Sequence, residues 1–335
     1  MPARAHARSA AIFVLFLALP PVAISQSALD RHRLAFASKQ GGAWDIYVTG
    51  VDGEKPIRLT ARPTPDRFPI WSPDGKRIAF GSERDGVWEL WLMNADGSDA
   101  RLLTRDIVAK SPRGWSRDGG LIVFESARDG NSEIYTVSTD GRVRRLTHNA
   151  APDRSPAWSP DGRRIAFVSS RAGGSEIFVI DLPGGSPKQL TRGAAAVLAS
   201  SPAWSPDGSR IVFASLRDGN RELYAVPADR GQPRRLTNDP ADDLIPVWSP
   251  DGTRIAFQAV RDGNYDIEVM DADGGNRTRL TTAPEYDGSH TWSPDGQSIA
   301  FISGRSGQDA LWVMRSDGRQ PARLTGPALD PRWSP

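Results

Sequence analysis

The sequence predicts an all-β fold, a seven-bladed β-propeller of four-stranded antiparallel blades, and three observations support this prediction. A tryptophan-centred phrase recurs about every forty-four residues, four strand-length segments recur within each repeat, and the two ends of the array complement each other. Repeats of this length are typical of propellers and solenoids, and propellers have four to eight blades. We therefore expect one propeller domain over residues 34–335.

The tryptophan stands in a phrase of the type Pro-Ala-Trp-Ser-Pro-Asp-Gly, as in residues 202–208. Seven tryptophans, spaced 41 to 46 residues apart, mark the repeats: Trp71, Trp115, Trp158, Trp204, Trp248, Trp292 and Trp333. In the turn that follows, proline fixes φ, aspartate bonds nearby backbone amides and glycine takes the strained final position. The phrase therefore predicts a hairpin that builds the scaffold, and we expect function where the repeats differ.

Each repeat contains four short segments rich in β-branched and aromatic residues. They are the tryptophan phrase, an Ile-Ala-Phe type, a Glu-Ile-Tyr type and an Arg-Arg-Leu-Thr type. Turn signals such as Arg-Asp-Gly separate the segments and exclude long helices. The apolar runs do not alternate with polar residues, which favours small sheets covered on both faces by neighbouring sheets.

The ends of the array predict how the ring closes. The first repeat begins at Leu34 without a tryptophan phrase, and the chain ends at Pro335 directly after the seventh. We expect the strand around Trp333 to pair with residues 33–38, so that the C-terminal strand completes the first blade and leaves no open edge. An open superhelix would need polar capping repeats, which the sequence lacks.

Residues 1–25 have the layout of a cleaved secretory signal, and residues 26–33 form a short segment before the propeller. Basic residues precede an apolar run from Ala10 to Leu19, which is too short to span a bilayer as a helix. Cleavage near Ser25 predicts a periplasmic or secreted protein without a membrane span. A signal that is retained as an anchor is the alternative.

Composition excludes several classes of protein. The chain has 42 basic and 40 acidic side chains, and loss of Arg4 and Arg8 with the signal would balance them. A neutral mature chain without a basic run argues against nucleic acid as a partner. There is no cysteine, hence no disulfide, thiol nucleophile or lipid-attachment cysteine. We expect a monomer stabilised by packing alone.

The repeat resembles the WD-like propeller repeat of the TolB family, which occurs also in the propellers of prolyl-oligopeptidase-type peptidases. The resemblance covers residues 34–335 and only the propeller portion, since TolB itself has an α/β domain before a six-bladed propeller. It implies that the tryptophan strand is innermost and the Arg-Arg-Leu-Thr strand outermost. It also implies a non-enzymatic protein that binds an envelope partner, as the TolB propeller binds the peptidoglycan-associated lipoprotein.

An acid stands five positions before the tryptophan in four repeats: Asp66, Asp153, Asp243 and Asp287. The other repeats have Lys110, Ala199 and Ala328 there, with Asp330 shifted by two. By the resemblance, these aspartates would line the docking face together with arginines of the Arg-Asp-Gly turns, which are Arg84, Arg128, Arg217 and Arg261. The ring of carboxylates could instead hold Ca²⁺, or each acid could pair with a turn arginine and serve the structure.

No catalytic motif is found: the sequence lacks a nucleophile elbow, a zinc-protease motif and a phosphate loop. The alternative function is a propeller enzyme that acts on a saccharide or lactone with a metal held by Asp243, Asp287 and His290. No cofactor is otherwise expected. A further acid opens the third strand of every repeat, and we expect this set to be structural: Asp45, Glu89, Glu133, Glu176, Glu222, Asp266 and Asp309.

Overall fold

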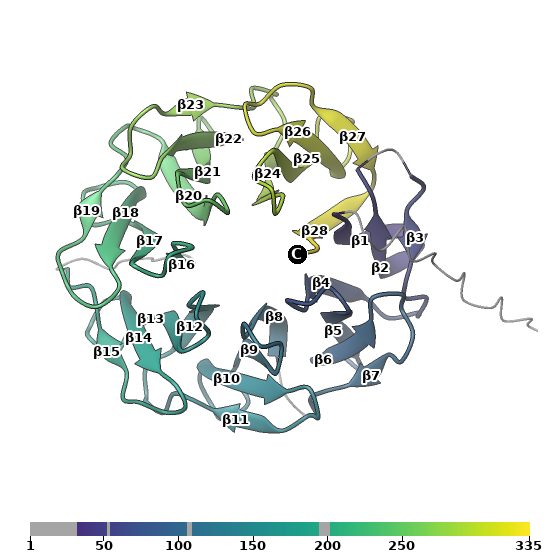
Figure 1. Cartoon of the computed structure of the whole chain (residues 1–335), viewed down its shortest axis with the longest axis horizontal. Helices are drawn as coiled ribbons and strands as arrows, with labels where there is room; N and C mark the ends of the chain where they lie inside the picture. Colours follow the sequence, from purple (N-terminus) through teal and green to yellow (C-terminus); the bar gives the residue numbers. More distant parts are fainter. Residues whose placement is uncertain (1–31, 52–53, 106–108, 194–201) are drawn as a thin grey trace, which may run out of the picture.

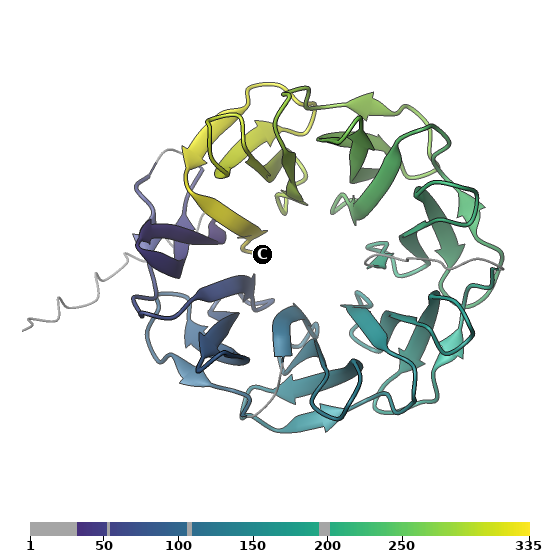
Figure 2. The same cartoon turned by 180° about the vertical axis from the view of Figure 1, so that it is seen from behind.

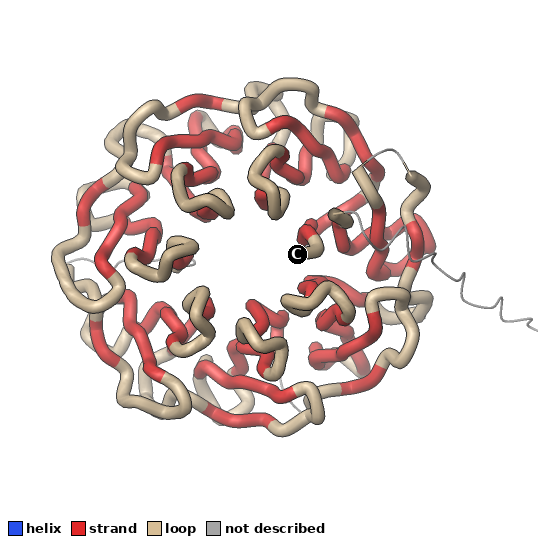
Figure 3. The backbone as a smooth tube through the Cα atoms, in the orientation of Figure 1, coloured by secondary structure: helices blue, strands red, loops and turns tan. Residues whose placement is uncertain are grey.

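The computed structural model describes residues 32–51, 54–105, 109–193 and 202–335. Seven four-stranded antiparallel sheets are arranged as blades around a central axis (Figure 1). The view from behind shows the same closed ring (Figure 2), and the described chain consists of strands and loops (Figure 3). The predicted seven-bladed propeller is confirmed. The expected signal, residues 1–25, lies outside the described residues.

Each blade takes one strand from each of four classes, in the order that the sequence predicts. The innermost strands are β28 (Ala328–Trp333), β4 (Asp66–Trp71), β8 (Ala109–Trp115), β12 (Asp153–Trp158), β16 (Ala203–Trp204), β20 (Asp242–Trp248) and β24 (Asp287–Trp292). The second strands are β1 (Leu34–Gly41), β5 (Arg77–Arg84), β9 (Leu121–Ser126), β13 (Arg164–Ser169), β17 (Arg210–Ser215), β21 (Arg254–Arg261) and β25 (Ser298–Ser303). We number the blades 1 to 7 in this order.

The outer half of each blade completes the sheet. The third strands are β2 (Ala43–Thr49), β6 (Val87–Asn94), β10 (Glu133–Ser138), β14 (Glu176–Asp181), β18 (Glu222–Pro227), β22 (Asn264–Asp271) and β26 (Ala310–Arg315). The outermost strands are β3 (Ile57–Arg58), β7 (Arg101–Leu102), β11 (Val143–Arg145), β15 (Lys188–Gln189), β19 (Arg234–Arg235), β23 (Thr278–Arg279) and β27 (Ala322–Thr325).

The core lies between blades rather than inside one of them. The Ile-Ala-Phe segments are fully buried; Ile78 and Phe80 of blade 2, for example, pack with Ile46 and Val48 of blade 1. Both faces of each sheet are therefore covered, which explains why the strands read as continuous apolar runs. The described part of the chain has no helix of the length and hydropathy that a membrane crossing needs.

The C-terminal strand closes the ring as predicted. β28 pairs antiparallel with β1, with Trp333 opposite Leu34 and Ala328 opposite Ser38. Ser334 extends the contact, because its backbone amide donates to the Arg33 carbonyl at 2.7 Å. Blade 1 is thus built from both ends of the propeller, and Figure 1 shows the last strand beside the first.

A ring of hydrogen bonds joins all seven blades. Each indole N–H donates to the backbone carbonyl of the residue that precedes the tryptophan of the previous blade, at 3.1 to 3.3 Å. At the closing blade, Trp333 donates to Thr291 and Trp71 donates to the Arg332 carbonyl. The recurring tryptophan therefore fixes the spacing of neighbouring blades.

The turn after each tryptophan forms the predicted hairpin. In blade 2, the Ser72 hydroxyl donates to Asp74 at 2.6 Å and accepts the Arg77 amide at 2.9 Å, while Gly75 has a φ of 66°. These turns lie on one face of the ring, which we call the Pro-Asp-Gly face. The turns between second and third strands, and the connections into the inner strands, form the opposite Arg-Asp-Gly face.

Most of the repeated acids of the third strand hold the outermost strand in place. Glu133, for example, accepts from the Thr147 hydroxyl at 2.5 Å and from Arg145 at 3.0 Å. The equivalent contacts are made by Asp45, Glu176, Glu222 and Asp266. Glu89 and Asp309 are exceptions. In blade 2, Leu102 takes the place of the partner arginine of blade 1, and in blade 7 the register places Ala310 opposite Ser303, where the other blades have the acid.

Candidate functional site

The four aspartates of the predicted ring begin or nearly begin their inner strands and are fully buried. Asp66, Asp153, Asp243 and Asp287 each have 0% of their surface exposed. In blade 2, Asp66 lies opposite Ser82 of the second strand, and the register is the same for Asp153 with Ser169 and for Asp287. The carboxylates therefore lie inside the blades and not on the surface of a mouth.

Three of these aspartates pair with the arginine of their own Arg-Asp-Gly turn or its equivalent. The shortest carboxylate–guanidinium distances are 3.6 Å for Asp66–Arg84, 2.6 Å for Asp153–Arg171 and 2.8 Å for Asp287–Arg305. Burial raises the pKa of Asp153, and hydrogen bonding from Ser169 and the charge of Arg171 oppose this rise. This is the structural pairing that the sequence left open as one of three alternatives. A contact between these carboxylates and a partner stays a prediction.

Blade 6 departs from this arrangement. Asp243 pairs with Arg277 at 3.0 Å, while Arg261 of the turn lies 3.5 Å from Asp239 and also bonds Glu268. Glu268 stands where other third strands have an aromatic side chain, and Arg277 bonds it as well. Burial raises the pKa of Asp243 to about 7, although the charge of Arg277 works against this.

The remaining predicted arginines lie in the turns as expected but make different contacts. Arg128 is 3.7 Å from Asp129, and its side chain is 36% exposed. Arg217 donates to the Ser215 hydroxyl at 3.1 Å and lies over the Tyr224 ring at 4.7 Å.

The strand register of blade 3 corrects the expectation that Lys110 is equivalent to Asp66. Ala109 and not Lys110 lies opposite Ser126, where Asp66 would be, because β8 has one additional residue before Trp115. Ala199 falls outside the described residues.

The residues proposed for a metal do not fit one. Asp243 and Asp287 lie in different blades, each engaged by an arginine, so their oxygens do not converge as Ca²⁺ requires. His290 is 3% exposed, and burial lowers its pKa to about 4, so it is neutral above that pH. Among the described residues, no three His, Cys, Asp or Glu side chains are grouped to hold a metal ion.

An aromatic and basic patch lies on the Arg-Asp-Gly face of blades 1 and 2. Trp44, Phe68 and Trp88 are half-buried there, and the rings of Phe68 and Trp88 are 5.6 Å apart. Arg67 lies over both Trp44 and Phe68, at 5.4 and 4.6 Å, and the exposed Lys39 lies over Trp44. We call these five residues the aromatic patch.

Sequence reasoning missed this patch, although the repeat contains its signal. Trp44 and Trp88 stand directly before the structural acid of the third strand. The equivalent positions of the other blades have Ser132, Ser175, Arg221, Tyr265 and Asp309. Two adjacent blades thus replace mostly polar residues with tryptophan.

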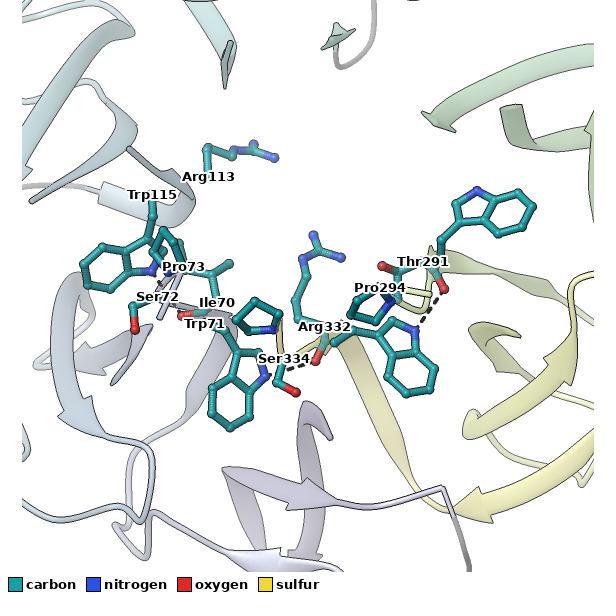
Figure 4. Close-up of a pocket in the computed structure, with 13 residues that line it drawn as sticks. Ile70, Trp71, Ser72, Pro73, Arg113, Trp115, Thr291, Pro294, Arg332 and Ser334 are labelled. Carbon is teal, nitrogen blue, oxygen red and sulfur yellow. Dashed lines mark hydrogen bonds between the residues drawn. The ribbon is translucent and has the colours of Figure 1, made fainter. Parts of the chain in front are cut away.

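A second place where the blades deviate from the repeat pattern lies at the opposite end of the propeller axis. A pocket of about 400 Å³ opens near the Pro-Asp-Gly face between blades 7, 1, 2 and 3. Its lining includes Pro73, Arg113, Thr291, Pro294, Arg332 and Pro335. Figure 4 shows the guanidinium groups of Arg113 and Arg332 directed into the open centre of this axial pocket.

The repeat pattern and the geometry of the ring agree with the comparison to protein families. The family described as TolB beta propeller domain matches residues 27–113, 106–197 and 192–335. This chain belongs to that family. No curated protein gives a significant match to the sequence.

Solved structures with a similar fold include TolB proteins and enzymes. A putative TolB from Agrobacterium tumefaciens is 25% identical over 85% of this chain and 98% of its own, with a TM-score of 0.58. A puromycin-hydrolyzing peptidase from Mycobacterium tuberculosis is 18% identical, with a TM-score of 0.71, over 88% of this chain but 53% of the peptidase. An oligogalacturonate lyase from Vibrio parahaemolyticus is 14% identical over 84% of this chain and 85% of its own, with a TM-score of 0.68. The last two show the fold alone.

Proposed function

We propose that this chain is a non-enzymatic TolB-like propeller of the periplasm or the extracellular space, and that it docks a protein partner of the cell envelope. The observation that supports this most is the aromatic patch. Tryptophan and arginine dominate the energetic centres of protein interfaces, and such centres are surrounded by contacts that exclude water. Half-buried aromatic rings beside two cations meet that description.

The aromatic patch differs from the rest of the Arg-Asp-Gly face in two ways that favour docking: it has tryptophans that the scaffold does not need, and its arginine is already oriented. Trp44 and Trp88 are not needed for the scaffold, because Ser132 and Ser175 serve at equivalent positions. Arg67 is held in place by Asp330 at 3.1 Å, so its guanidinium is oriented before any partner arrives. An oriented side chain loses less conformational entropy on binding. The peptidoglycan-associated lipoprotein is the partner that family membership suggests first.

The test is a cross-linking pull-down of the tagged mature protein from its own cell envelope, followed by affinity measurement with the protein recovered. The double variant Trp44→Ser, Trp88→Ser restores the residue of the equivalent positions. We expect it to bind at least tenfold more weakly, since a buried interface tryptophan contributes about 2 kcal/mol or more. Tyr265→Ser is the matched control, because it changes the same strand position in blade 6.

Two results would contradict the proposal. One is equal recovery of the same envelope protein by the wild type and the double variant, with the fold of both verified by circular dichroism. The other is an equal loss of binding in the Tyr265→Ser control, which would show that the patch has no special role.

A further inference from the structure

We infer that the axial pocket binds a small molecule with two anionic groups, carboxylates or phosphates, between Arg113 and Arg332. Nothing in this inference depends on the protein partner proposed above, because the aromatic patch lies on the opposite face. It rests on the position of the two arginines in the repeat, on the missing carboxylate partner of Arg332 and on the dimensions of the pocket.

Arg332 occupies a position where every other blade has a neutral residue. It pairs in register with Ala35, the central residue of the Leu-Ala-Phe segment of blade 1. The equivalent residues are Ile70, Gly114, Ala157, Ala203, Val247 and Thr291. The scaffold therefore needs no charge at this place, and the seventh tryptophan phrase introduces one directly at the axis.

Arg113 lines the pocket because of a separate change in the repeat, an additional residue in β8. The inner strands have a buried proline or histidine two positions before the tryptophan, as at Pro69 and His290. In blade 3 the additional residue of β8 shifts this proline to Pro112 and leaves Arg113 in its place. The Arg113 side chain is 37% exposed, unlike the residues it replaces. Two independent changes in the repeat thus place cations in one pocket.

The two arginines of the pocket differ in their acidic neighbours, and neither is held tightly by a carboxylate. Arg332 donates to the carbonyl of Pro331 at 3.1 Å, and among the described residues no carboxylate forms an ion pair with it. The nearby Asp330 is engaged by Arg67. Arg113 has a loose contact of 3.7 Å with Glu125, whose other oxygen accepts the Ser155 amide at 2.9 Å.

The electrostatics of Arg332 favour an anion. Arg332 is exposed to water in the pocket, but the surrounding blades partly desolvate its guanidinium, and this desolvation lowers its pKa. The Asp330 carboxylate opposes the shift and the Arg113 guanidinium adds to it. Two cations that point into the same pocket repel, and a bound anion reduces that repulsion. The guanidinium fork suits carboxylate and phosphate oxygens, which it binds in a bidentate manner.

The volume and shape of the pocket set the size of the ligand. About 400 Å³ lies within the range of small-molecule sites, which is roughly 300 to 1,000 Å³. Pro73, Pro294 and Pro335 provide a rigid apolar rim, and Thr291 also lines the pocket. A short carbon chain with an anionic group at each end would place its apolar middle against the prolines.

The test is isothermal titration calorimetry of the mature protein at low ionic strength with dicarboxylates from malonate to adipate and with the bisphosphate ester of 1,3-propanediol. The neutral diamides of the same acids are the ligand control. The protein variants are Arg332→Val, which restores the residue found at Val247, and Arg113→Ala. Arg154→Ala is the matched control, since Arg154 is an exposed arginine of inner strand β12 that does not line the pocket.

We expect at least one of these anions to bind with millimolar affinity or better and its neutral analogue not to bind. Arg332→Val and Arg113→Ala should each weaken binding at least tenfold, and Arg154→Ala less than twofold. A preference for dicarboxylates or for the phosphate ester would identify the anionic group. The inference is overturned if none of the anions binds, if either pocket variant binds as well as the wild type, or if Arg154→Ala has an equal effect.

Discussion

The two ends of the propeller axis use charge in different ways. On the Arg-Asp-Gly side, buried aspartates at repeated positions are paired with arginines, as Asp153 is with Arg171 at 2.6 Å. Near the Pro-Asp-Gly face, Arg332 stands where no other blade has a charge and forms no ion pair with a carboxylate of the described residues. In this propeller the recurring charges belong to the scaffold, whereas Arg332, which occurs in one blade and has no carboxylate partner among the described residues, is available to a ligand.

The largest effect is expected where a buried pair is broken. Asp153→Ala removes the partner of Arg171 and also the acceptor of the Asn149 side chain. The free energy of unfolding should therefore fall by about 3 kcal/mol. Urea unfolding measures this difference. Asp229→Ala is the matched control, because Asp229 is 90% exposed in its pair with Arg164 and should contribute less than about 1 kcal/mol. Equal losses for the two variants would refute the distinction.

The pH dependence of stability should single out Asp243. Its pKa in the folded protein is raised to about 7, above the usual 3.8, so the folded state holds this proton more tightly than the unfolded chain. The resulting stabilisation is fully present below about pH 4 and is lost as pH rises through 7.

The variant Asp243→Asn tests this, since it should lack that part of the pH dependence. Unfolding free energies at pH 4, 5.5, 7 and 8 would show wild-type stability falling relative to the variant over this window. A constant difference between the two proteins across these pH values would contradict the assignment.

A smaller loss of stability is expected when a recurring arginine near the Pro-Asp-Gly face, Arg210, is removed. Arg210 recurs in the repeat and lies over the Trp248 ring at 5.1 Å, as Arg77, Arg164 and Arg254 do over the next tryptophan. Arg210→Ala should reduce the free energy of unfolding by about 1 kcal/mol. Chemical denaturation provides the value, and a loss indistinguishable from zero would place Arg210 outside the scaffold.

The smallest effect on stability is expected at Arg332. Arg332→Val should change the free energy of unfolding by less than about 0.5 kcal/mol, because the side chain makes no ion pair and its removal relieves repulsion with Arg113. The same denaturation experiment measures it. A loss comparable to that of Asp153→Ala would mean that Arg332 is structural.

Much of this architecture is predictable from the sequence because the same physical constraints recur seven times. The tryptophan spacing predicts the blades, and the incomplete first repeat predicts that β28 pairs with β1. The site is less predictable. The aspartates at the start of the inner strands suggest either a surface ring or pairing with turn arginines, and the repeat pattern does not decide between them because burial depends on side-chain contacts.

The residues of the pocket and of the aromatic patch can be recognised as deviations from the repeat only when the strand register is known. Arg113 aligns with a proline, and the additional residue in β8 that exposes it becomes evident from the pairing of Ala109 with Ser126. Trp44 and Trp88 stand directly before an acid that is common to most blades. The position before this acid varies between blades, so its tryptophans are not part of the repeat pattern.

One paired measurement tests the central claim most directly: dicarboxylate affinity and unfolding free energy for Arg171→Ala and Arg332→Val. We expect opposite outcomes for the two variants. Arg171→Ala, which leaves Asp153 buried and unpaired, should lose stability and keep its affinity for the anion. Arg332→Val should keep stability and lose affinity at least tenfold. If stability and affinity fall together in either variant, or if Arg332→Val still binds the anion, the division between scaffold charges and ligand charges is wrong.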